Sequence, residues 1–169
     1  RKDSNDVPVD HWALLATEKL FSLDRGTELP VSRKLLINHA LQICEAMMES
    51  QVDDLTLPDY DGGFSREGRT TPTATRLEGL QAALSFLPAN HEICQHIERA
   101  VSRGIAFLLR AQVREGHYVG AFPRAVNYIR EDAKDADSFN RRVKQVRIDY
   151  VQHALSAMIQ YLEQRGVEL

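Results

Sequence analysis

The sequence feature that most constrains the fold is an internal repeat, a glycine-containing loop followed by a helix. One copy spans residues 62–84 and the other spans residues 120–155. The loops read Gly-Gly-Phe-Ser-Arg and Gly-Ala-Phe-Pro-Arg, and each comes after a predicted helix that ends near a glutamine, Gln51 or Gln112. The helices that follow share one order of residues: arginine, aliphatic, acid, any, aliphatic, glutamine, any, alanine, leucine. Because a recurring helical unit buries its apolar face on its neighbours, the repeat predicts stacked αα-hairpins.

The spacing of apolar residues along the chain indicates the same class of fold. Apolar residues recur every three to four positions in five long segments, and no segment alternates with a period of two, so we expect little or no strand. Asp10, Ser32 and Asn90 are predicted N-caps, and Pro88 is expected to stop the third helix. The predicted helices are residues 11–23, 33–51, 73–87, 91–114 and 146–164, with a short helical piece near 126–129. The prediction is a single all-α domain over residues 1–169.

Two stretches of the repeat also resemble a known superfamily. Residues 59–64, Asp-Tyr-Asp-Gly-Gly-Phe, lead into a helix ending Ala-Ala-Leu, and residues 107–112, Phe-Leu-Leu-Arg-Ala-Gln, precede the second glycine loop. Both resemble the repeat of the α/α-toroid enzymes of the terpenoid cyclase and protein prenyltransferase class, and the likeness covers residues 33–165. Six-hairpin glycosidases and polysaccharide lyases use related toroids. The resemblance implies αα-hairpins arranged as a partial or complete α/α toroid.

The number of predicted helices bears on the extent of the domain. Five long helices are too few for a ring of six hairpins, and the sequence starts at Arg1 rather than at a methionine. We therefore expect the domain to be a fragment of a longer chain and to contact the rest of that chain.

Two acids at equivalent repeat positions, Glu78 and Asp149, are the candidate catalytic residues. In a toroid the polar face of an inner helix looks into the central cavity, where two carboxylates could serve as general acid and base on a sugar. His153 is the third candidate catalytic residue, because it follows Asp149 by one helical turn, a spacing that allows a carboxylate–imidazole hydrogen bond. It could act as a general base, and the alternative is a structural histidine with a satisfied hydrogen bond. The alternative is structural: both acids pair with arginines and hold the hairpins together.

Side chains on the predicted rim loops are candidates for binding a substrate. An aromatic ring can stack on a sugar, and guanidinium groups can hold carboxylates through paired hydrogen bonds. The alternative is that these loops only close the ends of the hairpins. The candidate substrate-binding residues are Arg66, Tyr118, Arg124, Arg76 and Arg147.

Several kinds of site lack their signatures in this sequence. Thr70 stands where a calcium loop that starts at Asp59 would need its bidentate glutamate. The squalene-cyclase DxDD order, the prenyltransferase zinc ligands, the P-loop and the dinucleotide fingerprint have no counterpart. Cys44 and Cys94 lie in apolar helical contexts, which predicts buried free thiols. We expect neither a metal nor a cofactor.

Composition narrows the possible partners. The net charge of −3 gives no reason to expect nucleic acid. A local basic run, Arg141, Arg142, Lys144 and Arg147, is interpreted as a solvated approach to the last helix rather than a binding patch. No apolar stretch is long enough to span a bilayer, so no membrane contact is expected. The localisation stays open, and the two free cysteines slightly favour the cytoplasm.

Three functions fit these observations. The first is a carbohydrate-processing domain, hydrolase or lyase, that acts on a glycan or small molecule in a polar cavity. The second, from another class, is a non-catalytic helical repeat module within a larger protein, binding a ligand or partner through its loops. The third is isoprenoid cyclase or transferase chemistry, which needs an aromatic-lined cavity, and the 7% aromatic content argues against it.

Overall fold

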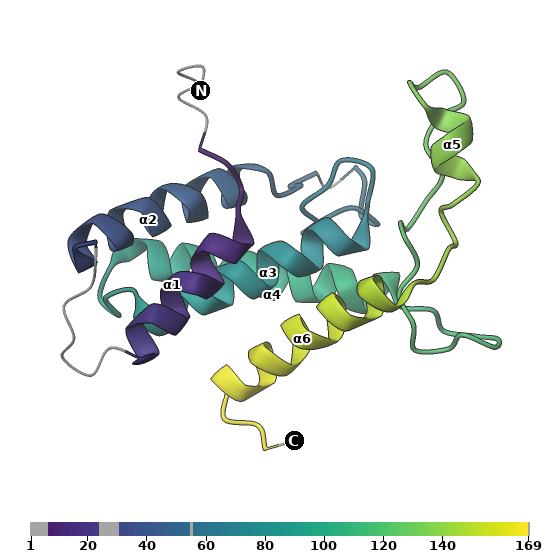
Figure 1. Ribbon diagram of the computed structural model, residues 1–169. Coiled ribbons are helices and arrows are strands. Elements are labelled where there is room, and N and C mark those ends of the chain that lie inside the picture. Colours follow the sequence, from purple (N-terminus) through teal and green to yellow (C-terminus); the bar gives the residue numbers. More distant parts are fainter. Residues whose placement is uncertain (1–6, 24–30, 55, 169) are drawn as a thin grey trace.

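In the computed structural model, which describes residues 7–23, 31–54 and 56–168, the protein is all-α, as predicted (Figure 1). Within these residues the only β-structure is two isolated bridges, Arg69 with Ala125 and Pro123 with Val146. None of the described helices has both the length and the apolar run needed to cross a bilayer. Arg1, part of the argument for a longer chain, lies outside the described residues. The helices are α1 (His11–Leu23), α2 (Arg33–Glu49), α3 (Thr70–Phe86), α4 (Glu92–Ala111), α5 (Ala136–Asn140) and α6 (Ile148–Gln164).

The starts of the helices agree with the sequence prediction at two places. The Asp10 carboxylate accepts a hydrogen bond from the Trp12 amide at 3.0 Å, and Ser32 Oγ accepts one from the Leu35 amide at 3.3 Å. The predicted cap of α4 is wrong by one residue, because the side chain of His91 rather than Asn90 caps the helix. α3 begins at Thr70, a turn earlier than predicted, which places Pro72 in its first turn, where a missing amide hydrogen costs nothing.

The short helical piece predicted near residues 126–129 is also wrong. The Val126 amide donates to the carbonyl of Gly68 at 3.0 Å, and both backbone groups of Ile129 bond to the side chain of Asn140. Because these backbone groups make tertiary hydrogen bonds, they are not available to a helix. The short helix of this region is α5 instead.

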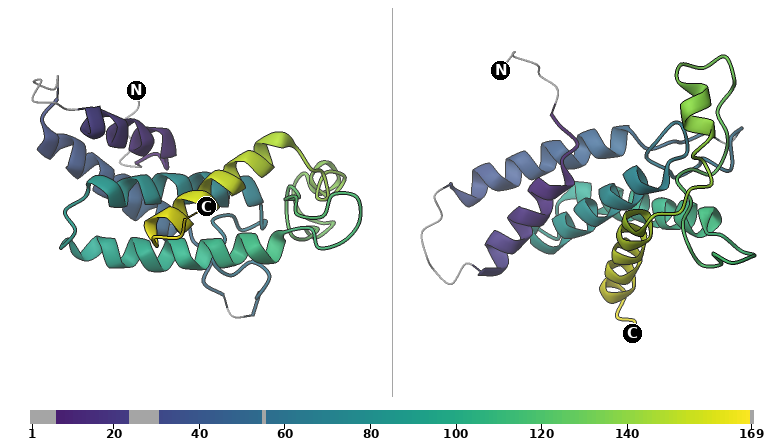
Figure 2. Two further views of the ribbon diagram at one scale, coloured as in Figure 1. Left: turned by 90° about the horizontal axis from the view of Figure 1, so that it is seen from below. Right: turned by 45° about the vertical axis from the view of Figure 1, so that its right-hand side comes forward.

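Helix α3 is the central element of the structure, and it packs against α1, α2, α4 and α6 (Figures 1 and 2). The close approach of α3 and α4 explains Gly104, which lies in the middle of α4. A Cβ at this position would lie 2.6 Å from Cδ2 of Leu77, which is completely buried. A larger residue would therefore push the two helices apart. The largest completely buried core side chains include Phe107, Leu14, Ile43, Met47, Leu77, Leu80, Ile97 and Leu108.

The repeat recognised in the sequence has the same hydrogen bonds in both copies. Gln51 Nε2 donates to the carbonyl of Gly62 at 2.9 Å, and Gln112 Nε2 donates to the carbonyl of Gly120 at 2.9 Å. The residue after each glutamine exchanges backbone hydrogen bonds with the glycine loop: Val52 with residues 62–63, and Val113 with residues 120–121. The two glycine loops lie about sixty residues apart in the sequence, and both are held by the same pattern of hydrogen bonds.

Residues 112–147, which we call the loop lobe, project from one end of the helices (Figures 1 and 2). The lobe has its own small core of Ala125, Phe139 and Val143, with Ile129 packed on it. It is joined to the start of α3 through the hydrogen bond from the Thr70 amide to the Arg124 carbonyl, at 3.0 Å. The lobe is therefore an ordered extension fixed to the start of the central helix.

The two repeat glycines give a matched test of the fold. Both have a positive φ, 78° at Gly62 and 88° at Gly120, but a Cβ at Gly62 would lie 2.3 Å from the Arg103 carbonyl oxygen, whereas nothing lies within 4 Å at Gly120. We expect Gly120→Ala to lower the free energy of unfolding by about 1–2 kcal/mol through backbone strain alone. Gly62→Ala adds a backbone clash and should cost more than about 3 kcal/mol. Urea unfolding measures both, and equal losses would contradict this account.

Candidate functional site

The first candidate site is a buried pair of ionisable side chains where α3 meets α6. His153 Nδ1 and Glu78 Oε2 are hydrogen bonded at 2.8 Å, and their side chains are only 16% and 7% exposed. The sequence spacing allows a hydrogen bond from His153 to Asp149 on its own helix, and the structure pairs His153 with Glu78, the acid of the other repeat. Glu78 is therefore part of the contact between α3 and α6, and its carboxylate is hydrogen bonded to the imidazole of His153.

His11, at the start of α1, completes this cluster. Its ring lies 6.2 Å from the ring of His153 in an edge-on arrangement, and its Nε2 is buried without a hydrogen-bond partner among the described residues. Gly79 permits the approach, since a Cβ there would lie 2.9 Å from Cβ of His11. Burial lowers the pKa of His11, and the nearby His153 and Arg76 lower it further, while Glu78 and Asp10 oppose the shift.

Of the two arginines next to the candidate acids in the sequence, Arg76 binds away from Glu78, whereas Arg147 pairs with Asp149. Arg76 Nη1 donates to the Phe64 carbonyl at 2.9 Å and so ties the first glycine loop to α3. Burial lowers the pKa of Arg76. Arg147 Nε pairs with Asp149 at 3.0 Å, with side chains 56% and 38% exposed, and its guanidinium lies over the Tyr150 ring. Glu78 is thus buried in one pair and Asp149 lies at the surface in another.

The three loop residues predicted to bind a substrate line three different hollows. Arg66 borders one of about 530 Å³ beside Asp53 and Asp54, Tyr118 borders one of about 580 Å³, and Arg124 borders one of about 450 Å³. The last two belong to the loop lobe and lie next to its small core. All three volumes fall in the range of small-molecule sites.

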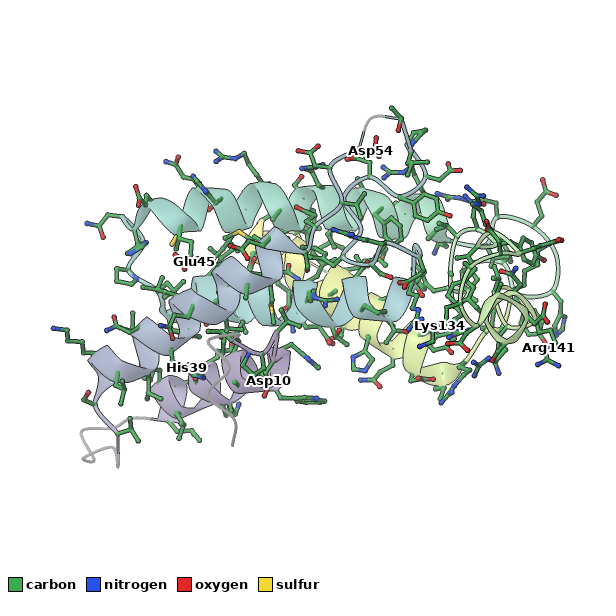
Figure 3. All side chains as sticks on the ribbon, turned by 90° about the horizontal axis from the view of Figure 1, so that it is seen from above. Asp10, His39, Glu45, Asp54, Lys134 and Arg141 are labelled. Atoms are coloured by element: carbon green, nitrogen blue, oxygen red, sulfur yellow. The ribbon has the colours of Figure 1, made fainter. Side chains whose placement is uncertain are left out.

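The hollow beside Arg124, which we call the arginine hollow, is rich in positive charge. Four cations and two carboxylates line it, together with the aromatic ring of Phe139. Figure 3 shows Lys134 in the lobe, together with Arg141 and far from Asp10 and His39. The charged residues are Arg69, Arg124, Lys134, Arg142, Glu67 and Asp135.

Two guanidiniums of the arginine hollow are held by the ring of Phe139. Those of Arg124 and Arg69 lie 4.8 and 5.4 Å from its centre. Burial lowers the pKa of Arg124, the positive charges of Arg142 and Arg69 lower it further, and Tyr150 and Glu67 oppose the shift. Asp135 has a left-handed φ of 61°, the only such non-glycine residue among those described. The arginine hollow thus combines neighbouring positive charges with an uncommon backbone conformation.

The hollow beside Tyr118, which we call the tyrosine hollow, is mainly apolar. Valine side chains from three parts of the lobe and Pro123 line it, and Tyr118 and Tyr128, at 61% and 57% exposed, stand at its edge. Lys144 and Glu115 add charge. Exposed aromatic side chains of this kind suit contact with an apolar or ring-shaped ligand.

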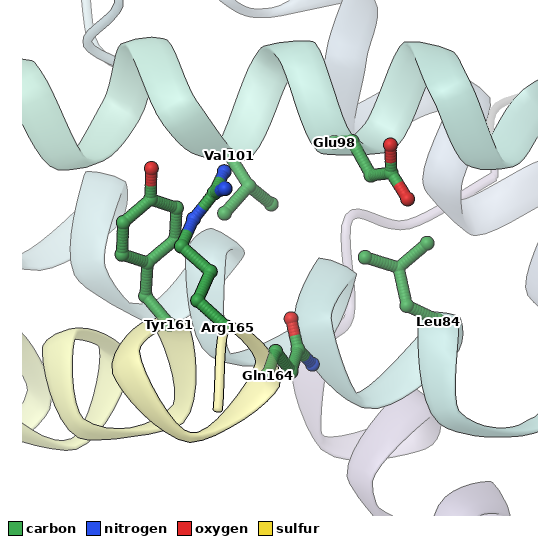
Figure 4. A pocket seen from close by; sticks show the side chains of 6 residues that line it. All are labelled: Leu84, Glu98, Val101, Tyr161, Gln164 and Arg165. Atoms are coloured by element: carbon green, nitrogen blue, oxygen red, sulfur yellow. The ribbon is translucent and has the colours of Figure 1, made fainter. Parts of the chain in front are cut away.

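A smaller hollow among α3, α4 and α6 is shown in Figure 4. It measures about 180 Å³ and is lined by six residues, among them Glu98, Tyr161 and Arg165. The Arg165 guanidinium lies 4.3 Å from the centre of the Tyr161 ring. This volume is below the range of small-molecule sites.

The sequence reasoning missed His11 and most of the arginine hollow. His11 gave no signal, because only the packing of α1 on α3 brings it to Glu78. Arg142 belongs to the basic run that was interpreted as a solvated face; it is exposed, as that interpretation expects, and it also lines the arginine hollow. Cys44 and Cys94 are buried free thiols, as predicted. Within the described part of the chain, no group of three or more histidine, cysteine or acidic side chains is placed to hold a metal ion.

Comparison with known proteins finds no matching family model, no matching curated protein and no matching solved structure.

The lowered pKa of His11 predicts a pH-dependent stability. Its reference value is 6.5 and the folded value is lower, so the unfolded chain binds this proton more readily than the folded one. The free energy of unfolding should therefore fall as the pH drops below 6.5 and level off below the folded pKa. His11→Gln should lose this part of the dependence in urea unfolding between about pH 7.5 and about pH 5.5.

The matched control for this prediction is His96→Gln, because His96 is an exposed histidine on α4. It should keep the dependence of the wild type. An unchanged pH profile in His11→Gln would mean that the burial of His11 contributes nothing to it.

Proposed function

We propose that this protein is a non-catalytic helical-hairpin module that binds a small polar ligand through its loop lobe. The observation that carries the proposal is the lobe itself. It is a segment with its own core that presents two hollows of about 450 and 580 Å³, one cationic and one edged by tyrosines. Binding residues are commonly carried by loops that a rigid scaffold positions, and the helices supply such a scaffold here.

The surroundings of the acids favour binding over catalysis. A general acid or base has to reach the substrate, within hydrogen-bond distance or through one water. Glu78 is almost fully buried against His153, and Asp149 is paired with Arg147. Neither acid lines any of the four hollows described above. Exposed aromatic and cationic groups are found instead on the lobe.

A ligand screen tests the proposal. We expect members of a library of sugars, sugar acids and phosphorylated metabolites to shift the NMR signals of the lobe. Tyr118→Ala should weaken binding of such a ligand about fivefold or more, since an aromatic contact is worth about 1 kcal/mol or more. Trp12→Ala is the matched control, because Trp12 is an exposed aromatic residue on α1, 63% exposed. Absence of any ligand that perturbs the lobe would contradict the proposal.

A second candidate function, a carbohydrate-processing hydrolase or lyase, is favoured by the hydrogen-bonded Glu78–His153 pair. A carboxylate that orients an imidazole is a common arrangement in general-base catalysis. The sequence repeat supports this candidate only because it resembles the repeat of α/α-toroid enzymes.

Hydrolysis and elimination assays on a panel of glycans test the second candidate. If it is right, Glu78→Gln should lower kcat about a hundredfold or more while leaving the folded state intact by circular dichroism. Asp149→Asn should have the smaller effect, because Asp149 lies in an exposed pair. A wild type inactive on every glycan would leave the binding module as the function.

A further inference from the structure

We propose that the arginine hollow is a site for an oxyanion, a carboxylate or phosphate group, carried by the ligand of the loop lobe. This inference rests on the proposed function and assigns its charged contact to Arg69, Arg124 and Arg142.

The charge balance of the hollow is the first reason. Four cationic side chains face two carboxylates, although the protein as a whole carries a net charge of −3. Glu67 and Asp135 supply two negative charges against four positive ones, so the hollow keeps an excess of positive charge. Glu67 approaches Arg69 Nε only to 3.9 Å, which is too long for a hydrogen bond, and that nitrogen has no other partner among the described residues. Positive charge is thus concentrated here against the sign of the whole molecule.

The way the arginines are held is the second reason. Arg124 and Arg69 rest on the Phe139 ring, and Arg142 donates to the Ser138 carbonyl at 3.1 Å and to Ser138 Oγ at 3.2 Å. These contacts fix the side chains before a ligand arrives, so binding does not have to order them. Among the described residues, the Arg124 guanidinium donates a hydrogen bond only to the Phe139 carbonyl, through a long contact of 3.4 Å.

The geometry of the guanidinium groups indicates which kind of anion the hollow would bind. A guanidinium presents parallel N–H groups that match the two oxygens of a carboxylate or phosphate, and charge-assisted bonds of this kind are stronger than neutral ones. An anion in the hollow would also relieve the repulsion among Arg69, Arg124 and Arg142. A volume of about 450 Å³ leaves room for the part of the ligand that carries the anion.

The experiment titrates the protein with methyl phosphate in one arm and acetate in the other, at constant ionic strength. The readout is the side-chain Nε–Hε NMR signals of the arginines. We expect saturable shifts of Arg69, Arg124 and Arg142, and the tighter arm identifies which oxyanion the hollow prefers. Arg142→Gln should weaken binding about tenfold or more, because it removes a charge-assisted contact.

Two further variants make the result specific. Arg130→Gln makes the same charge change in the same lobe, but Arg130 is 86% exposed, is paired with Asp132 and does not line the hollow, so binding should be unchanged. Arg124→Lys keeps the charge while losing the paired donors, and it should weaken binding by an intermediate factor. Equal weakening in Arg130→Gln and Arg142→Gln, or no saturable shift, would overturn the proposal.

The failure of this inference can be told apart from failure of the proposed function. If library ligands bind the lobe and depend on Tyr118 but not on Arg142, the module binds a ligand and the oxyanion site is wrong. If the fragments saturate the arginines but no library ligand binds, the oxyanion site stands and the proposed function fails.

Discussion

The hydrogen bond from a glutamine amide to a glycine carbonyl is the interaction on which the two hairpins depend. Gln51 and Gln112 follow the last turns of α2 and α4, and each donates to the glycine at which the chain turns back. Both glycines have a positive φ, which glycine adopts without strain. The same glutamine, Gln51, also donates to the Ala100 carbonyl on α4, so it connects the first loop to the next hairpin.

The burial of α3 determines what its polar residues can do. Because α3 packs on four other helices, Glu78 and Gln81 on it are almost completely buried. Both residues bond to α6: Glu78 is hydrogen bonded to His153, and Gln81 Nε2 donates to the Ala157 carbonyl at 3.0 Å, while Gln81 Oε1 has no partner among the described residues. The polar face predicted to look into a cavity is thus used to attach α6.

The sequence predicted the local structure well, because the signals for it are local. The all-α class, two of the caps, the free thiols and the repeated loop follow from periodicity, capping chemistry and glycine spacing. The sequence match between α3 and α6 does not extend to the burial of their matching residues. The repeat pattern alone could not predict this difference. Leu77 and Ile148 match in the repeat, yet Leu77 is completely buried under α4 and Ile148 is 84% exposed, since no described helix covers it. The same difference separates buried Glu78 from partly exposed Asp149.

The arginine hollow shows why site residues are harder to predict than helices. Glu67 and Arg69 precede α3, while Arg124, Phe139 and Arg142 come from the lobe some sixty residues later, and no periodicity links them. They meet because the backbone of residues 68–70 bonds to residues 124–126, the fixed junction between lobe and scaffold. The same junction lets the guanidiniums of Arg69 and Arg124 share the Phe139 ring. Glu78 and Gln81 on the central helix are used in packing against α6, whereas the junction brings the cationic side chains of two distant segments together at one hollow.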